Sequence, residues 1–229
     1  MKKLSVYCII LLLISCASNI KFTGAQKSLK IDFSNIPTTI SMDTVMRGQF
    51  HLFENLGGNE FLFTINTFEK DKDVNSIFTA TYDSEEGRII WYHSIYDTTY
   101  KNINVFAAKC DTLNRLTYLY LSFSKKLIND TNRKIVLYCI DDKGNIKWDY
   151  PTVSEFIVSM NILPNSNLLV SGAKENTHFY KILDNNGEVL EEKNFDLPSI
   201  IIDNEARMPI INSLHLLENQ DFIVTSCFC

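Results

Sequence analysis

Residues 137–148 read Leu137-Tyr-Cys-Ile-Asp-Asp-Lys-Gly-Asn-Ile-Lys-Trp148. An apolar run leads into a short polar turn that starts with Asp and ends with Gly, and a second run with Ile and Trp follows. The Asp side chain can accept hydrogen bonds from backbone N–H groups of the turn, and Gly adopts the positive φ that leads into a return strand. This stretch therefore predicts a tight β-hairpin.

The same pattern occurs in residues 78–91 and 179–191, so the chain carries three copies. Side chains two apart on a strand point to the same face. We therefore expect the Ile or Val two residues after Gly and the Trp four residues after it to pack together on the neighbouring sheet. The turn residues are Asp83 and Gly87, Asp141 and Gly144, and Asp184 and Gly187, and the aromatic packing positions are Trp91 and Trp148.

A second type of hairpin alternates with these copies. Apolar runs joined by polar turns occupy residues 50–65, 105–121, 156–171 and 211–225. Leu62, Leu119, Leu169 and Ile223 are equivalent in them and are separated by 57, 50 and 54 residues. The repeating unit is thus four antiparallel strands in roughly 50 residues, which is typical of a propeller blade.

The stretch 137–148 resembles the repeat of quinoprotein-like and outer-membrane-lipoprotein β-propellers, and the short exported-propeller repeats that end Asp-x-x-Gly-x-Val-x-Trp. The likeness covers most of residues 46–229. It implies an all-β fold of four-stranded antiparallel blades, three complete and one partial. The third copy departs at Glu191, so its blade contact must form differently. Because the repeat is structural, the resemblance implies no cofactor and no catalytic residues.

The blade count leaves two possibilities open, because the fourth blade has only two predicted strands. Leu29–Phe33 and Thr38–Thr44 are strand-like runs that could complete it and give a four-bladed ring. The alternative, which we favour, is a fragment of a larger ring of roughly six to eight blades. A separate hypothesis, about function and not about blade number, is that the chain is a truncated product without function.

The first residues predict export and a lipid anchor. Lys2 and Lys3 precede the apolar run Leu4–Ile14, which is shorter than the ~20 residues of a membrane-spanning helix and reads as a secretory signal. The run ends in Ser15-Cys16, which resembles the bacterial lipobox: a peptidase cleaves between the two residues, and the Cys16 sulfur carries diacylglycerol. An ordinary signal peptide with a chance Cys is the alternative.

These features divide the chain into a signal peptide (1–15), a polar tether (16–28) and a propeller-like domain (29–229). Two or three acyl chains such as palmitate anchor a protein stably to a bilayer. Ala17 follows the lipidated Cys, and the lack of Asp there favours the outer membrane of a Gram-negative cell envelope by resemblance to known sorting rules.

Charge weakens the case for a nucleic-acid partner. The chain has 22 Lys and Arg against 27 Asp and Glu, and the net charge of −5 becomes −7 without Lys2 and Lys3. Affinity for nucleic acid comes largely from basic groups on phosphates. We expect a non-catalytic domain that binds an envelope protein or a glycan. The competing class is an exported propeller enzyme, a hydrolase or transferase that uses His, Asp or Arg and whose catalytic face is incomplete here.

Catalytic and metal-ligating residues are not predicted. The chain has no GxSxG, Walker, GxGxxG or HExxH motif, and its four His residues do not fall into a spaced set of metal ligands. Outside the signal and Cys16, the cysteines fit no paired zinc pattern, so buried single residues are expected. They are Cys110, Cys139, Cys227 and Cys229.

Two further groups are candidate surface sites. Tyr92, Tyr96, Tyr100 and Tyr150 fall at or beyond predicted strand ends, where they either ring a binding face or pack between blades. Three Asp-Thr-x triplets resemble the Asp-Ser/Thr-apolar acceptor of a bacterial protein O-glycosylation system. Their candidate acceptors are Thr44, Thr98 and Thr112.

Overall fold

The structure is a computed structural model of the chain. It describes residues 21–24, 27–30, 40–41, 50–69, 71–125, 133–152, 155–174, 177–196, 200–202, 205–207, 210–216 and 222–227. The regular elements among these residues are all β-strands. Ser15, Cys16 and Thr44 lie outside the described residues, as does Cys229.

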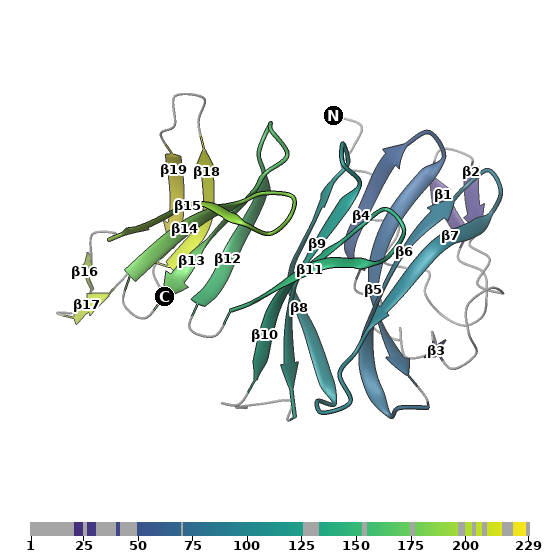
Figure 1. Ribbon diagram of the computed structural model, residues 1–229, viewed down its shortest axis with the longest axis horizontal. Coiled ribbons are helices and arrows are strands. Elements are labelled where there is room, and N and C mark those ends of the chain that lie inside the picture. The colour runs from purple at the N-terminus through teal and green to yellow at the C-terminus, as the bar shows by residue number, and fades with distance from the viewer. Residues whose placement is uncertain are drawn as a thin grey trace. The chain divides into compact units, whose positions relative to one another are not determined.

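Three sheets each hold four long antiparallel strands that follow one another in chain order (Figure 1). The first contains β4 (Phe50–Gly57), β5 (Glu60–Glu69), β6 (Val74–Asp83) and β7 (Arg88–Ile95). The second contains β8 (Asn102–Asp111), β9 (Leu116–Ser124), β10 (Lys134–Ile140) and β11 (Ile146–Pro151). The third contains β12 (Glu155–Ile162), β13 (Leu168–Lys174), β14 (Thr177–Leu183) and β15 (Val189–Phe195).

A two-stranded sheet of β18 (Ile210–Leu216) and β19 (Phe222–Cys227) follows. The predicted all-β fold, with three complete blade-like sheets and one partial one, is confirmed. Each predicted Asp-Gly turn joins the third and fourth strands of a sheet, and the alternating hairpins supply the first and second strands.

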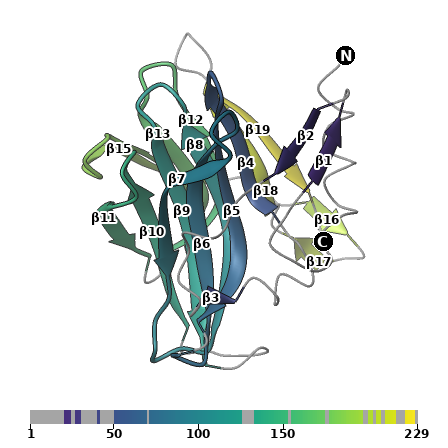
Figure 2. The same ribbon diagram turned by 90° about the vertical axis from the view of Figure 1, so that its right-hand side faces the viewer.

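The N-terminal strands differ from expectation. β1 (Lys21–Gly24) and β2 (Lys27–Lys30) pair with each other, so a hairpin reaches into the segment expected to be a polar tether (Figure 2). β3 (Ile40–Ser41) pairs with the far end of β5 in the first sheet. These two residues of the run 38–44 therefore extend the first sheet. The sequence analysis had instead considered this run as a strand that could complete the last blade. Another short pair is β16 (Ile200–Ile202) with β17 (Glu205–Arg207).

The chain forms two compact units. The first consists of Met1–Val105, Ser122–Arg133 and Asp141–Asn145, and the second of Phe106–Leu121, Lys134–Ile140 and Ile146–Cys229. Each unit therefore contains one Trp of the repeat together with the Gly turn of the next copy.

In the first unit, β6 is buried on both faces. Its Phe78 and Tyr82 are almost fully buried on one face, and Phe78 stacks on Tyr92 of β7 with ring centroids 5.4 Å apart. Thr79 on the other face hydrogen-bonds Thr64 of β5 across 3.0 Å. The polar face of β6 can be buried because paired hydroxyls satisfy each other inside the sheet packing.

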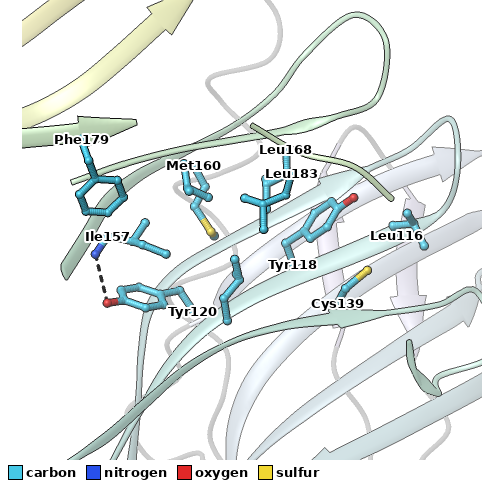
Figure 3. Close-up of a cluster of buried hydrophobic side chains, with 11 residues drawn as sticks. Leu116, Tyr118, Tyr120, Cys139, Ile157, Met160, Leu168, Phe179 and Leu183 are labelled. Carbon is cyan, nitrogen blue, oxygen red and sulfur yellow. Dashed lines mark hydrogen bonds between the residues drawn. The ribbon is translucent and has the colours of Figure 1, made fainter. Parts of the chain in front are cut away.

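In the second unit, the core joins β9 and β10 to β12, β13 and β14 (Figure 3). Tyr118 and Tyr120 of β9 lie among Leu, Ile and Met side chains, and each large buried side chain contributes about 1.5–3 kcal/mol through removal from water. The backbone N–H of Ile157 donates a hydrogen bond to the Tyr120 hydroxyl at 3.1 Å. The tyrosines thus add polar contacts to the apolar packing between strands far apart in sequence.

Candidate binding surface

In each of the three repeat turns, the Asp carboxylate accepts hydrogen bonds from backbone N–H groups of its own turn. Asp141 Oδ1 accepts bonds from the backbone N–H groups two and four residues later, at 2.9 and 2.8 Å. Asp184 does the same at 2.8 and 2.9 Å, and Asp83 accepts from residues two and three later at 2.8 and 3.1 Å. The N–H donors lower the pKa of Asp184, and in Asp141 they outweigh burial and also lower the carboxyl pKa. The glycines at the ends of the turns, Gly87, Gly144 and Gly187, have φ of 71°, 83° and 83°.

Each Trp of the repeat covers the turn glycine of the following copy. In the first unit, a Cβ added to Gly144 would lie 2.7 Å from Cε3 of Trp91. In the second unit, a Cβ on Gly187 would lie 2.8 Å from Cδ2 of Trp148, whose Nε1 donates to the carbonyl of Asn185 at 3.1 Å. Glycine is therefore required twice over, for its positive φ and for the space that the indole ring fills.

The third copy has a polar contact within its own sheet at this position. Glu191 stands at the Trp position, and its carboxylate accepts a hydrogen bond from the Tyr180 hydroxyl. Burial and this carboxylate raise the pKa of Tyr180 to about 12, so the phenol remains a donor at neutral pH. Tyr180 packs in a small apolar cluster with Leu169 and Leu214 of β18.

The Ile and Trp positions of the first copy do not share a face, which corrects the sequence expectation. Tyr82 pairs with Ile89, whereas the neighbouring Thr81 pairs with Trp91. Ile90 is therefore the extra residue of a β-bulge, and a bulge reverses the alternation of side chains. Ile89 is buried on one face, and the Trp91 ring lies on the other.

The same bulge recurs in the other two copies, at Lys147 of β11 and Leu190 of β15. Because of these bulges, Ile146 and Val189, which the sequence predicted to pack beside the Trp position, are each 41% exposed. Only in the first copy does the residue two after Gly enter a core. The spacing rule failed because it assumes an unbroken strand.

A buried ion pair lies in the second unit. The Lys181 ammonium donates to both carboxylate oxygens of Glu155, at 2.8 and 2.9 Å, and to the Tyr150 hydroxyl at 2.8 Å. It also lies 5.4 and 5.5 Å from the ring centroids of Tyr150 and Phe179. Burial alone would lower the pKa of Lys181, but the bonds to Glu155 and Tyr150 outweigh it and raise the pKa.

This cluster is a connector between two sheets, since Tyr150 lies near the end of β11 and the charged partners lie on β12 and β14. The Lys181 side chain is only 4% exposed. Sequence reasoning missed the cluster because a single Lys on a strand normally lies in solvent. Its only sequence signal is the position of Lys181 between Tyr180 and Ile182, inside an apolar strand.

An exposed aromatic pair lies in the same unit. Phe106 of β8 and Phe156 of β12 are each 40% exposed, and their rings meet edge to face with centroids 5.4 Å apart. The Tyr120 ring packs against both, with its centroid 5.5 Å from that of Phe106 and 6.3 Å from that of Phe156. Its hydroxyl accepts a hydrogen bond from the backbone N–H of Ile157. Phe106 and Phe156 are 50 residues apart, the same spacing as Leu119 and Leu169, so they occupy equivalent positions of two successive first strands.

The four tyrosines proposed to ring a face have different roles. Tyr92 is partly exposed while it stacks on Phe78, and Tyr96 lies beneath the Lys72 ammonium at 6.0 Å. Tyr100 is half-buried against Phe123, with ring centroids 6.3 Å apart. Tyr150 is half-buried against Lys181. The exposed pair in the second unit therefore consists of phenylalanines that the sequence had not marked.

The histidines occupy separate environments. His51 shares a hydrogen bond with Asn66 at 3.1 Å, and His93 bonds the backbone of Gly144. Burial lowers the pKa of both, so they are neutral at pH 7. His178 is buried beside Phe195. In the described part of the chain, no group of three or more His, Cys, Asp or Glu side chains is placed to hold a metal ion.

The remaining predicted site residues lie as follows. Thr98 and Thr112 are exposed in turns, Cys139 is buried in the core of the second unit and Cys110 is half-buried. The backbone of Cys227 ends β19. Among the residues that the structure describes, no helix is long and apolar enough to cross a membrane.

No protein-family model matches this chain, and no curated protein is similar to it.

We expect Gly144→Ala and Gly187→Ala each to lower the free energy of unfolding by roughly 2–4 kcal/mol, because the methyl group meets the indole ring and the backbone stays left-handed. Gly58 is a matched control, since its φ is 60° and no atom lies within 4 Å of an added Cβ. Gly58→Ala should cost about 1 kcal/mol. Urea unfolding followed by tryptophan fluorescence measures all three, and equal losses would contradict the Trp–Gly contact.

Glu155→Gln should destabilise the protein by about 3 kcal/mol, because it leaves the buried Lys181 ammonium with only its longer contact to the partly exposed Glu192 carboxylate, at 3.6 Å. Lys181→Met should cost less, since Lys174 lies 3.4 Å from the Glu155 carboxylate and remains as its partner. Glu86→Gln is the control, because Glu86 pairs with Arg88 in solvent and such pairs contribute about 0–1 kcal/mol. Thermal and urea unfolding test this order, and a Glu155→Gln protein as stable as Glu86→Gln would refute it.

Proposed function

We propose that this protein is a lipid-anchored lipoprotein of the bacterial cell envelope whose blade-like domain binds a protein or a glycan and catalyses no reaction. The observation that carries the binding role is the exposed pair Phe106–Phe156. Support for the anchor comes from the sequence pattern that ends in Ser15-Cys16.

The aromatic pair has the properties of a binding surface. Aromatic side chains are enriched at interfaces because they bury a large apolar area and lose few rotamers on binding. Phe106 and Phe156 contact each other, and Tyr120 supports both, so the two rings are held in place before a partner arrives. Such preorganisation lowers the entropy cost of association.

The Lys181 cluster supports a structural role. Amines that act in catalysis need access to a substrate, and the Lys181 side chain is 4% exposed and engaged by Glu155 and Tyr150. Its charge is neutralised inside the protein. This buried charged group therefore connects two sheets and does not favour an enzymatic function.

Cys16→Ala should abolish membrane partitioning, because each buried CH₂ of an acyl chain stabilises binding by about 0.8 kcal/mol and this variant removes every chain. Cys8→Ala, inside the apolar run, is the matched control and should still fractionate with membranes. The measurement is the protein's distribution between membrane and soluble fractions of the expressing bacterium. If the Cys16→Ala protein stayed in the membrane fraction, the lipid anchor would be refuted.

Phe106→Ser and Phe156→Ser should each weaken partner binding by tenfold or more, which corresponds to about 1.4 kcal/mol, since exposed aromatic anchors dominate such interfaces. Ile146→Ser is the control, because Ile146 is equally exposed in the same unit but lies on β11. Proteins and glycans retained from envelope extract by immobilised wild-type and variant domains are quantified side by side. Equal retention by all four proteins would refute a role for the aromatic pair.

A further inference from the structure

We propose that Thr112, at the tip of the β8–β9 hairpin, is the acceptor of an O-linked glycan. The residue is exposed and belongs to the triplet Asp111-Thr112-Leu113. This inference does not depend on the binding role of the aromatic pair.

The turn that carries Thr112 is built rigidly. The Asp111 carboxylate is buried and accepts bonds from the backbone N–H groups of Leu113 at 3.1 Å and Asn114 at 3.3 Å. The Asn114 side-chain amide donates to its second oxygen at 2.8 Å. Arg115 closes the turn with φ of 55°. The Asp of the triplet is thus used to shape the turn, and Thr112 is displayed on a fixed backbone.

The third residue of the triplet is available to a modifying enzyme. Leu113 is 80% exposed, more than any other exposed large hydrophobic side chain in the described residues. It therefore contributes little to the packing of its own domain. A transferase that reads an apolar side chain after the acceptor would find both Leu113 and the Thr112 hydroxyl on the same turn.

A second triplet shares one of these hydrogen bonds. The Asp97 carboxylate accepts a bond from the N–H of Thr99 at 2.9 Å, and Thr98 between them is exposed. Two triplets at different places in the fold thus each hold an exposed middle Thr in a turn that its Asp stabilises. Thr98 lacks the exposed apolar neighbour that Thr112 has, so Thr112 is the stronger acceptor.

The first repeat turn supplies a natural comparison. Asp83-Ser84-Glu85 contains the same bond, from the Glu85 N–H to the Asp83 carboxylate at 2.8 Å. Ser84 is only half-buried, but the third residue is charged. If recognition requires an apolar third residue, Ser84 stays unmodified although its backbone conformation matches.

The modification is a glycosyl transfer from an activated donor, a sugar joined to a phosphate carrier, catalysed by a separate transferase. The Thr112 Oγ1 attacks the anomeric carbon, the bond between that carbon and the phosphate oxygen breaks, and the carrier phosphate leaves with the bonding electrons. The hydroxyl proton passes to a base of the transferase. The product is a bulky, hydrated group on an exposed turn, where glycans are tolerated.

The test is the intact mass and peptide map of the full-length protein extracted from the envelope of its own host. The expected result is a glycan mass on the peptide that contains Thr112. It should be absent from Thr112→Ala and retained in Thr112→Ser, which keeps the hydroxyl. Thr177→Ala removes an exposed Thr that Asp does not precede and should retain it.

A wild-type Thr112 peptide without added mass would overturn the proposal, even if Thr98 carried a glycan. Retention of the mass by Thr112→Ala, or its loss from Thr177→Ala, would overturn it as well. The same spectra show whether Cys16 carries acyl chains. A lipidated protein without a glycan therefore refutes this inference alone and leaves the proposed anchor standing.

Discussion

The contact between an indole ring and a turn glycine is the constraint on which each unit depends. Trp91 covers Gly144 and Trp148 covers Gly187, and in both pairs an added Cβ would lie within 3 Å of the ring. The contact fixes the turn conformation, because a residue with a side chain fits neither the positive φ nor the space. It also fixes the hydrogen bonds of the preceding Asp, whose acceptor atoms are aimed at N–H groups only in that conformation.

Strands buried on both faces also enclose polar side chains, and internal partners lower the cost of burying them. In the first unit the hydroxyls of Thr64 and Thr79 pair with each other. In the second unit the Lys181 charge is compensated by Glu155 and supported by Tyr150. The two solutions differ in cost, because a buried charge loses far more hydration than a hydroxyl. The ion pair is therefore the more specific connector, since it forms only when β12 and β14 are both correctly paired with β13, which lies between them.

The strands, turns and repeat were predictable from sequence because turn chemistry is local: Asp, Gly and the apolar runs beside them act within a few residues. The sequence did not predict which side chains of the fourth strands point to which face of the sheet. The bulges at Ile90, Lys147 and Leu190 decide this, and they depend on the hydrogen bonds to the neighbouring strand. The pairing of Lys181 with Glu155 joins residues 26 apart, which no pattern along the chain marks. The Phe106–Phe156 pair was in principle readable, since its spacing equals the repeat period.

The residues proposed for function lie outside the Asp, Gly and Trp positions of the repeat. The Asp, Gly and Trp positions are committed to turn shape and packing, and a change at any of them disturbs the neighbouring copy. Phe106 and Phe156 lie on first strands, and Thr112 lies at the tip of the hairpin between a first and a second strand. None of them makes the turn or Trp contacts described above. Exposed side chains on the first strands, and at the tips of the hairpins that lack the Asp-Gly turn, can therefore serve binding or modification without disturbing these contacts.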